Sequence, residues 1–340
     1  MNQKAKLSDI AKHAGVSQAA VSRFLNGSLE VRDETRLRIE TAIDELQYIP
    51  NQVARSLRTQ TTRSVGIVLP NIENPLFAAI STGIEERLRQ EGYSMMVLIN
   101  KNDLDLERKC VESLLGQSVD GVIFIGYPNK LNLDQDDGYI RKLLNTGIGV
   151  VFVNRSFSDQ SARAGISSVN SNYAQGAREA IHYLVSGGRR RFAAIMGNWN
   201  HPHSREKLLG YQEALREHDL ELAPGCLEEG KYDFDQAYRA AQKLLKARPD
   251  AILVANDLMA IACMKALGDQ RIAVPGDVAV IGYGDTILCK MATPELSSIN
   301  QDAYQLGYQG GELLLQKIKT KAISHATILL PTRFVPRQSS

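Results

Sequence analysis

A stretch near the start of the chain, Gly15 to Gly27, combines residue types that recognise nucleic acid. Ser17 can cap a helix there, because its hydroxyl can accept from the free amides of the first turn. One face of that helix would be apolar, formed by Ala20, Val21, Phe24 and Leu25. The open face would carry Gln18, Ala19, Ser22 and Arg23. Amide, methyl, hydroxyl and guanidinium groups are the ones that contact base edges in the DNA major groove.

Two further short helices are expected around this stretch. Leu7 to Ala14 has inward apolar residues and stops at Gly15, and Thr35 to Leu46 has similar helical spacing. Two short helices joined by a Gly-Val-Ser turn are typical of a helix-turn-helix, whose second helix lies in the major groove. An ordinary surface hairpin of helices has the same pattern, so the local signal leaves both alternatives open.

The segment Leu-Ser-Asp-Ile-Ala-Lys-His-Ala-Gly-Val-Ser-Gln-Ala-Ala-Val-Ser-Arg-Phe-Leu-Asn-Gly, residues 7–27, resembles the N-terminus of the LacI/GalR family of bacterial transcription repressors. Tyr-Ile-Pro-Asn-Gln-Val-Ala-Arg-Ser-Leu, residues 48–57, does so too, and the resemblance continues in register to the last residues. It implies a helix-turn-helix DNA-binding domain at 1–50, a hinge helix and linker at 51–61, and an effector-binding and dimerisation domain at 62–340.

The resemblance also implies a set of DNA contacts, made by Ser17, Gln18, Ala19, Ser22, Arg23, Asn26, Asn51, Val53, Ala54 and Leu57. The hinge helix is expected to fold only where two copies meet in the minor groove, with Leu57 wedged between base pairs. A plain linker is the alternative for so short a segment. The implied partners are a palindromic operator in double-stranded DNA and a second copy of the chain. Gln47 stands where the family usually has Gly or Asn, which puts the geometry of that helix end in doubt.

From Arg63 onward, short apolar strands alternate with helices. Strands are expected at 65–69, 95–99, 122–125 and 149–153, and then, in a second series, at 192–196, 251–254 and 278–282. Regular alternation indicates an α/β protein of parallel sheets with helices on both faces, and two series imply two lobes. This is similar to the type I periplasmic-binding-protein fold, which binds ligands at the carboxyl ends of the strands. The resemblance implies three crossings between the lobes, near Asn154, Leu288 and Lys321.

The expected ligand is a small, sugar-like effector held by a few polar groups and aromatic faces. The resemblance implies that the residues near it are Asn71, Phe77, Asn154, Arg155, Trp199, Arg205, Lys207, Tyr232, Asn256, Asp257 and Asp285. Several have structural alternatives. Phe77 and Tyr232 could belong to the core, Trp199 could anchor a loop, and Asn256 with Asp257 could cap a helix.

Two departures from the family pattern concern the charge of this site. Lys207 stands where the family usually has Arg, and Gly284 stands where it usually has an acidic residue. The loss of one negative charge beside Lys207 favours an acidic effector, such as a sugar acid or a sugar phosphate. Arg155 and Arg205 would add positive charge if their side chains turn inward. The alternative is that Asp285 takes the vacated place and binds the hydroxyls of a neutral sugar.

The composition limits the classes of protein to which this chain could belong. The 340 residues are 44% hydrophobic and 23% charged, as in soluble globular proteins. The start of the chain lacks the pattern of a signal peptide, and no apolar run is long enough for a membrane span, which predicts a cytoplasmic protein. The four cysteines are scattered, so free thiols are expected. Residues 1–64 hold 10 Lys+Arg against 7 Asp+Glu, a positive balance on the segment expected to meet phosphates.

No catalytic motif, dinucleotide fingerprint or metal-ligand pattern is found, so neither an enzyme nor a cofactor is expected. His201 and His203 could be a metal pair, but without a third ligand a loop role is favoured. The sequence therefore predicts a DNA-binding transcriptional regulator, a repressor of carbohydrate-utilisation genes whose operator affinity depends on the effector. A sugar solute-binding protein without a transcriptional role is the alternative.

Overall fold

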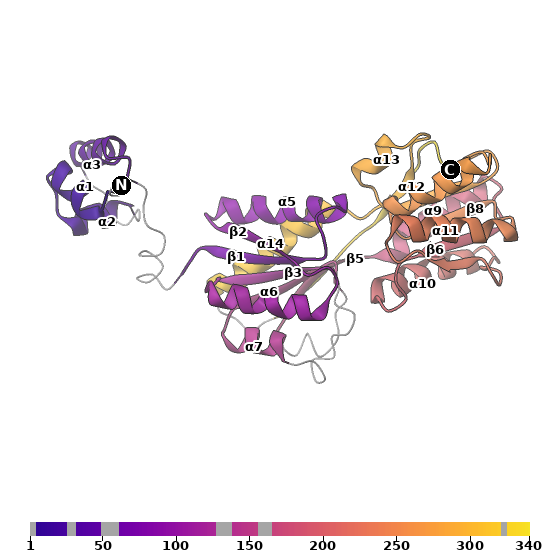
Figure 1. The fold of residues 1–340 in the computed structure, drawn as a ribbon, viewed down its shortest axis with the longest axis horizontal. Coiled ribbons are helices and arrows are strands. Elements are labelled where there is room, and N and C mark those ends of the chain that lie inside the picture. Colours follow the sequence, from indigo (N-terminus) through magenta and orange to yellow (C-terminus); the bar gives the residue numbers. More distant parts are fainter. Residues whose placement is uncertain (1–4, 26–31, 49–60, 127–137, 156–164, 321–324) are drawn as a thin grey trace. The chain divides into compact units, whose positions relative to one another are not determined.

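The computed structural model describes residues 5–25, 32–48, 61–126, 138–155, 165–320 and 325–340. The chain divides into a small unit, Met1–Thr62, and a large unit, Arg63–Ser340 (Figure 1). The small unit consists of helices α1 (Leu7–Ala14), α2 (Gln18–Leu25) and α3 (Asp33–Glu45) in its described part. Its core is formed by Ile10, Ala11, Ala14, Val21, Ile39 and Ala42. The predicted three-helix headpiece is thereby confirmed.

Local hydrogen bonds fix the turn of the helix-turn-helix. The Ser17 hydroxyl accepts from the Ala20 amide at 3.1 Å, as the cap prediction requires. Gly15 ends α1 in the left-handed conformation, with a φ of 66°. The Arg38 guanidinium, reaching across from α3, donates to the carbonyl oxygens of Ala14 and Gly15. These carbonyls have no partner within α1, so Arg38 both satisfies them and ties α3 to the turn.

The end of α3 shows how the chain accommodates Gln47. Its φ is 48°, in the left-handed region that the usual Gly or Asn adopts more readily. The Gln47 amide bonds to the Asp44 carbonyl and the Tyr48 amide to the Ile43 carbonyl, at 3.2 and 3.0 Å. This pair of bonds is a Schellman motif. The departure from the family pattern therefore leaves the helix end intact.

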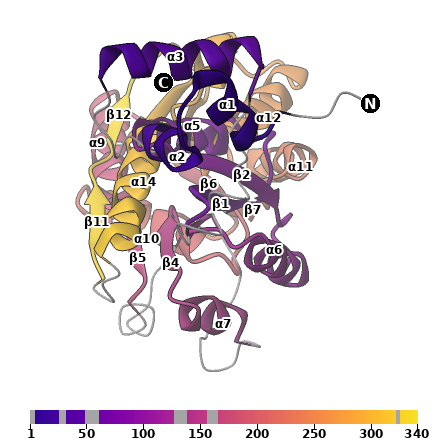
Figure 2. The same cartoon turned by 90° about the vertical axis from the view of Figure 1, so that its left-hand side faces the viewer.

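The first lobe of the large unit is built on a six-stranded parallel sheet of order β11-β5-β4-β3-β1-β2. Its strands are β1 (Ser64–Leu69), β2 (Ser94–Ile99), β3 (Gly121–Ile125), β4 (Gly149–Val153), β5 (Ser167–Ser171) and β11 (Thr327–Leu330). Helices α5 (Pro75–Gln90) and α14 (Ala303–Thr320) cover one face, and α6 (Leu104–Gly116) and α7 (Tyr139–Asn145) the other. Figure 2 shows α14 beside β11, both from the last part of the chain.

The second lobe is built on a six-stranded sheet of order β12-β10-β9-β8-β6-β7, parallel except where β12 pairs with β10. Its strands are β6 (Phe192–Met196), β7 (Leu227–Glu229), β8 (Ala251–Val254), β9 (Ala279–Gly284), β10 (Ser297–Asn300) and β12 (Arg333–Val335). Helices α9 (Tyr173–Ser186) and α10 (Pro202–Arg216) pack together, as do α11 (Phe234–Leu244) and α12 (Asp257–Asp269). The short elements η1 (Leu245–Ala247) and α13 (Ile287–Met291) complete this lobe. Across both lobes, all four cysteines of the chain are free and buried.

The chain crosses between the two sheets after β5, after β10 and after β11, that is, at 171–173, 300–303 and 330–333. The expected crossings near Asn154 and Leu288 are wrong, and Lys321 lies outside the described residues. The first error arose because β5 reads Ser-Ser-Val-Asn-Ser, with one apolar residue, although its backbone pairs with β4 and β11. β10, Ser-Ser-Ile-Asn, hid the second crossing in the same way.

Helices α5 and α14 pack with their backbones in close approach, and glycines make this possible. A Cβ at Gly307 would overlap the Ile80 carbonyl oxygen, and one at Gly83 would overlap the Tyr304 carbonyl oxygen. Neither helix can move away freely, because both also bury leucines against the first sheet.

We therefore expect Gly307→Ala to lower the free energy of unfolding of the large unit by about 1–3 kcal/mol, the usual cost of overpacking. Gly268→Ala is the matched control, since no atom lies within 4 Å of a Cβ at that helical position. Removing a glycine from a helix stabilises it by up to about 1 kcal/mol, so the control should unfold at an equal or higher urea concentration. Equal urea midpoints for Gly307→Ala and wild type would contradict the close packing.

Candidate DNA-binding surface and effector site

The second helix of the headpiece presents the face that the sequence predicts. Val21 is fully buried, whereas Gln18, Ala19 and Arg23 are exposed and Ser22 is half-buried. The Arg23 Nε lies over its own helix and donates to the Ala19 carbonyl at 3.3 Å. The remaining DNA contacts expected from the family, Asn26, Asn51, Val53, Ala54 and Leu57, lie outside the described residues.

The expected effector residues of the first lobe occupy different environments. Asn71 follows β1 and accepts from the Asn74 amide at 2.9 Å, in the turn that leads into α5. Phe77 is 6% exposed and packs in the core between α5 and the sheet. The core alternative therefore accounts for Phe77, whereas Asn71 stands at the carboxyl end of the first sheet.

Asn154 lies at the carboxyl end of β4 and links the two lobes. Its Oδ1 accepts from the Tyr173 hydroxyl at 2.9 Å, and its carbonyl oxygen accepts from Nε2 of His203 at 2.7 Å. Tyr173 and His203 belong to α9 and α10 of the second lobe. His203 is thus a buried residue of a helix, contrary to the loop role expected for it.

Arg155 turns into the first lobe instead of presenting a free charge. Its guanidinium is 2% exposed, lies over the rings of Phe124 and Phe152, and pairs with Glu107 at 3.1 Å. Glu107 also accepts from Asn100 Nδ2 at 2.6 Å and from the Tyr139 hydroxyl. Arg155 therefore adds no net charge to the effector site, which corrects the expectation.

Aromatic residues gather where the second lobe's β6 and β7 end. Tyr232 packs its ring on Gly197, and its hydroxyl lies 3.2 Å from that of Ser204. His201 stacks on the same ring, with the two centroids 5.9 Å apart, and burial lowers the pKa of His201 to about 4. Trp199 is half-buried, and its amide donates to Glu229 at 2.8 Å. His201 is consequently neutral near pH 7.

Lys207 is buried at the carboxyl end of β8. Its Nζ donates to the Ala255 carbonyl at 2.9 Å and lies 4.0 Å from the ring centroid of Tyr283 and 5.5 Å from that of Tyr173. Burial is the main cause that lowers the pKa of Lys207 to about 7, against the opposing charges of Asp257 and Glu206. Arg205, two residues earlier, is exposed.

Asn256 and Asp257 begin α12. The Asn256 side chain accepts from the Met259 amide at 2.8 Å, so the capping alternative holds for it. The buried Asp257 carboxylate accepts from the Ser298 hydroxyl at 2.6 Å and from the Thr286 amide at 2.7 Å. Burial raises the pKa of Asp257, and these hydrogen bonds oppose that shift.

Asp285 is engaged by neighbouring side chains. Its carboxylate pairs with Arg337 at 2.5 Å and accepts from Asn300 Nδ2 at 2.7 Å. The preceding Gly284 has a φ of 131°, and a Cβ there would lie 3.1 Å from Oδ2 of Asp257. The Asp257 carboxylate therefore lies beside the place of the family's usual acidic residue.

The residues that sequence reasoning missed are partners of those it found: Glu107, Tyr173, Tyr283, Ser298 and Arg337. His203 was considered only as one of a possible metal pair. Glu107 left a signal, because it is spaced with Cys110, Val111 and Leu114 as one buried helical face. A carboxylate in such a stripe indicates a buried ion pair. Tyr173 and Arg337 left none, since their partners are distant in sequence.

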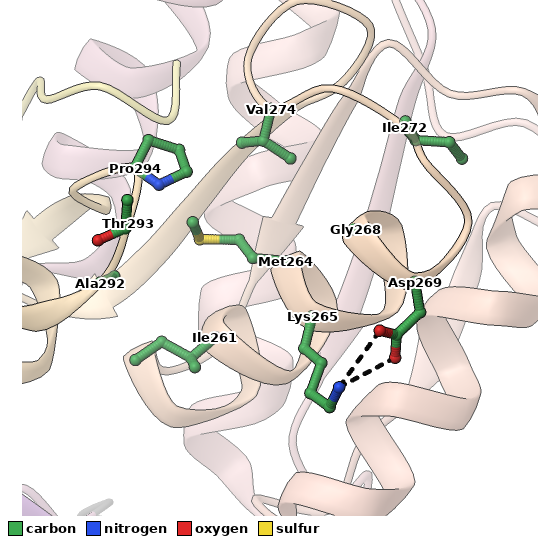
Figure 3. A pocket seen from close by; sticks show the side chains of 10 residues that line it. All are labelled: Ile261, Met264, Lys265, Gly268, Asp269, Ile272, Val274, Ala292, Thr293 and Pro294. Atoms are coloured by element: carbon green, nitrogen blue, oxygen red, sulfur yellow. Dashed lines mark hydrogen bonds and ion pairs between the residues drawn. The ribbon is translucent and has the colours of Figure 1, made fainter.

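A pocket of about 410 Å³ lies elsewhere in the second lobe, along α12 (Figure 3). Its walls are Ile261, Met264, Lys265, Gly268, Asp269, Ile272, Val274 and Ala292–Pro294. None of the expected effector residues lines it. Within the described residues, no group of three or more His, Cys, Asp or Glu could hold a metal, and no helix is long and apolar enough to cross a membrane.

Comparison with known proteins identifies the family to which the chain is similar. Residues 6–51 match the family described as bacterial regulatory proteins, lacI family, and residues 181–340 match a periplasmic binding protein-like domain. Catabolite control protein A of Staphylococcus xylosus is 32% identical over 326 residues, 96% of each chain. The ribose operon repressor of Haemophilus influenzae is 29% identical over 337 residues, 98% of each.

The chain belongs to the LacI family of bacterial regulatory proteins. The Lac repressor dimer bound to operator and the anti-inducer ONPF aligns with a TM-score of 0.85 at 29% identity, covering 99% of each chain. The regulator CelR in complex with cellobiose aligns with a TM-score of 0.73 at 29% identity, covering 99% of this chain and 100% of CelR. The predicted family, the two-lobed fold and the class of DNA-binding transcriptional regulator are confirmed.

In this LacI-family protein, removing one partner of the buried Glu107–Arg155 pair is expected to destabilise the first lobe. Glu107→Gln would leave the guanidinium buried without a counter-charge, which costs about 3–5 kcal/mol in unfolding free energy. Glu112→Gln, on the exposed face of the same helix, should change it by less than about 0.5 kcal/mol. Urea unfolding followed by circular dichroism measures both, and equal losses would contradict the assignment.

Proposed function

We propose that this protein binds a palindromic operator as a dimer and represses genes of carbohydrate utilisation, with a sugar-like effector controlling its affinity for the operator. The observation that carries the proposal is the exposed Gln18–Ala19–Arg23 face of a capped second helix, in a headpiece that matches the family. The match over residues 6–51 disfavours the alternative of a solute-binding protein. Because its target is the chromosome, such a repressor acts in the cytoplasm, and it needs no catalytic activity.

The proposed effector site comprises polar and aromatic residues at the carboxyl ends of the strands in both lobes. Asn71 and Asn154 come from the first lobe, and Trp199, Lys207 and Asp257 from the second. Open α/β sheets bind ligands at these strand ends, which supports the assignment. Carbohydrates are supported as the ligand class by the relatives, since CelR is in complex with cellobiose and another relative is a ribose operon repressor.

Dimerisation follows from the proposed operator, because two half-sites require two headpieces. Apolar side chains are exposed on both lobes, among them Val97 and Ile99 on the edge strand β2 and Ile287 and Met291 on α13. Met291 is 72% exposed and adjoins Ala292, in the wall of the pocket along α12. We assign these surfaces to a second copy of the chain. The hinge residues, with Leu57 as a wedge, would then meet in pairs on the DNA.

The first prediction for this function concerns base recognition. Arg23→Ala should cost about 1–3 kcal/mol of discrimination, the value of a bidentate contact between arginine and guanine, and flatten the preference at one base of each half-site. Arg36→Ala removes an exposed charge from α3 and should retain the preference. Binding selection from randomised DNA measures the base preference of each variant. A preference unaltered in Arg23→Ala would refute the assignment.

The proposed dimer can be tested at Met291. Met291→Asp should raise the dissociation constant of the dimer by at least about tenfold, because burying a methionine contributes roughly 1.5–3 kcal/mol and burying a charge is unfavourable. Leu209→Asp is the control, since Leu209 is 52% exposed on α10, outside the proposed surface. Sedimentation velocity over a concentration series measures the constants. A wild-type monomer at micromolar concentration would contradict the dimer.

A further inference from the structure

The ammonium group of Lys207 has fewer hydrogen bonds than it has donors. It carries three N–H groups, and one of them donates to the Ala255 carbonyl. The described residues supply no further acceptor to Nζ. The rings of Tyr283 and Tyr173 face the rest of the group. Because Lys207 is 5% exposed, water satisfies little of what remains. A buried cation in this condition points to a ligand that supplies acceptors.

Nearby carboxylates do not form an ion pair with Lys207. Asp257 accepts from Ser298 and Thr286, and no carboxylate oxygen of the described residues lies within 4.0 Å of Nζ. Glu206 is 46% exposed and lies 3.3 Å from Nδ1 of His203. Asp257 and Glu206 therefore act on Lys207 only at longer range, and burial outweighs them in lowering its pKa.

The other charges expected at the site are either neutralised or exposed. Arg155 pairs with Glu107, Asp285 pairs with Arg337, and Arg205 is exposed to solvent. In the alternative, Asp285 would bind the hydroxyls of a neutral sugar only through the lone pairs that its bonds with Asn300 and Arg337 leave free. Lys207 is thus the cation for which a ligand could supply the missing partner.

We infer that the effector carries an anionic group, a carboxylate or a phosphate, which pairs with the ammonium of Lys207. The inference rests on the proposed effector function and specifies its ligand class. Gly284 is consistent with it, because an acidic side chain there would add a second negative charge beside Asp257. Charge-assisted hydrogen bonds of this kind are about twice as strong as neutral ones.

Pairing of Lys207 with an anion should make the affinity for the effector depend on pH. The titratable and charged groups around Lys207 are Glu206 and His203 on α10, Asp257 on α12, and Tyr173 and Tyr283, whose raised pKa values keep them neutral. Without ligand, Lys207 has a pKa of about 7, and an anion favours its protonated form. Binding therefore takes up a proton above that pH, and affinity should fall as pH rises, by at most about tenfold per pH unit.

Calorimetry on the full chain can test this with matched ligands: D-glucose against D-glucuronate and D-glucose 6-phosphate, and D-galactose against D-galacturonate. We expect at least one acidic member to bind roughly tenfold or more tightly than its neutral partner at about pH 6. Carboxylate and phosphate members distinguish the two sources of charge. Inorganic phosphate is the minimal probe, and it should raise the melting temperature more near pH 6 than near pH 9.

Substitutions at Lys207 distinguish the effect of its charge from the effect of its packing. Lys207→Met should abolish the preference for the acidic member and the stabilisation by phosphate. Lys207→Arg should retain the preference and lose the fall in affinity near pH 9, because arginine stays protonated. Lys243→Met removes an exposed lysine of the same lobe and should behave as wild type. Tighter binding of the neutral sugars, or acid and phosphate binding that survives Lys207→Met, would overturn the inference. Operator binding, measured separately by fluorescence anisotropy, tests the proposed function, so the two failures are distinguishable.

Discussion

The energetic cost of burying charge governs the ends of the strands in the large unit. Each parallel sheet directs polar side chains to its carboxyl edge, where the lobes also shield them from water. Arg155 meets this constraint through Glu107, and Asp285 meets it through Arg337. Asp257 meets it through a hydroxyl and an amide. Such compensation fixes side chains in place, since breaking one partner leaves an uncompensated charge. Lys207 is the exception, which is why we assign it to the proposed effector.

The same edge holds the contacts that join the lobes. Asn154 receives hydrogen bonds from Tyr173 and His203, so a change in the relation between the lobes must break or strain these bonds. β1 begins at Ser64, just after the segment that follows the headpiece, and it ends two residues before Asn71. One buried strand therefore spans the distance in sequence between the DNA-binding unit and an expected effector residue. It is a short covalent connection between the proposed effector site and the segment that precedes β1.

Periodicity and turn chemistry predicted the headpiece, most of the strands and the two-lobed architecture, because apolar spacing and caps are local. β5 and β10 escaped prediction, since polar strands pair through their backbone and carry little apolar signal. The crossings were misplaced for that reason. At the site, residue types identified Lys207, Asn154 and Asp257 as candidates. Their partners depended on tertiary contacts, as with Arg155, whose direction was decided by a carboxylate 48 residues away.

The surroundings of Gly284 oppose the acidic residue that the family usually has at this position. A non-glycine residue there would be strained, because its φ of 131° is rarely adopted by L residues. The added carboxylate would also stand close to Asp257, whose Oδ2 lies 3.1 Å from the position of the new Cβ. Two carboxylates in so small a space would raise the pKa of one of them. A switch to the family's usual pattern would therefore require Asp257 and the backbone after β9 to change together.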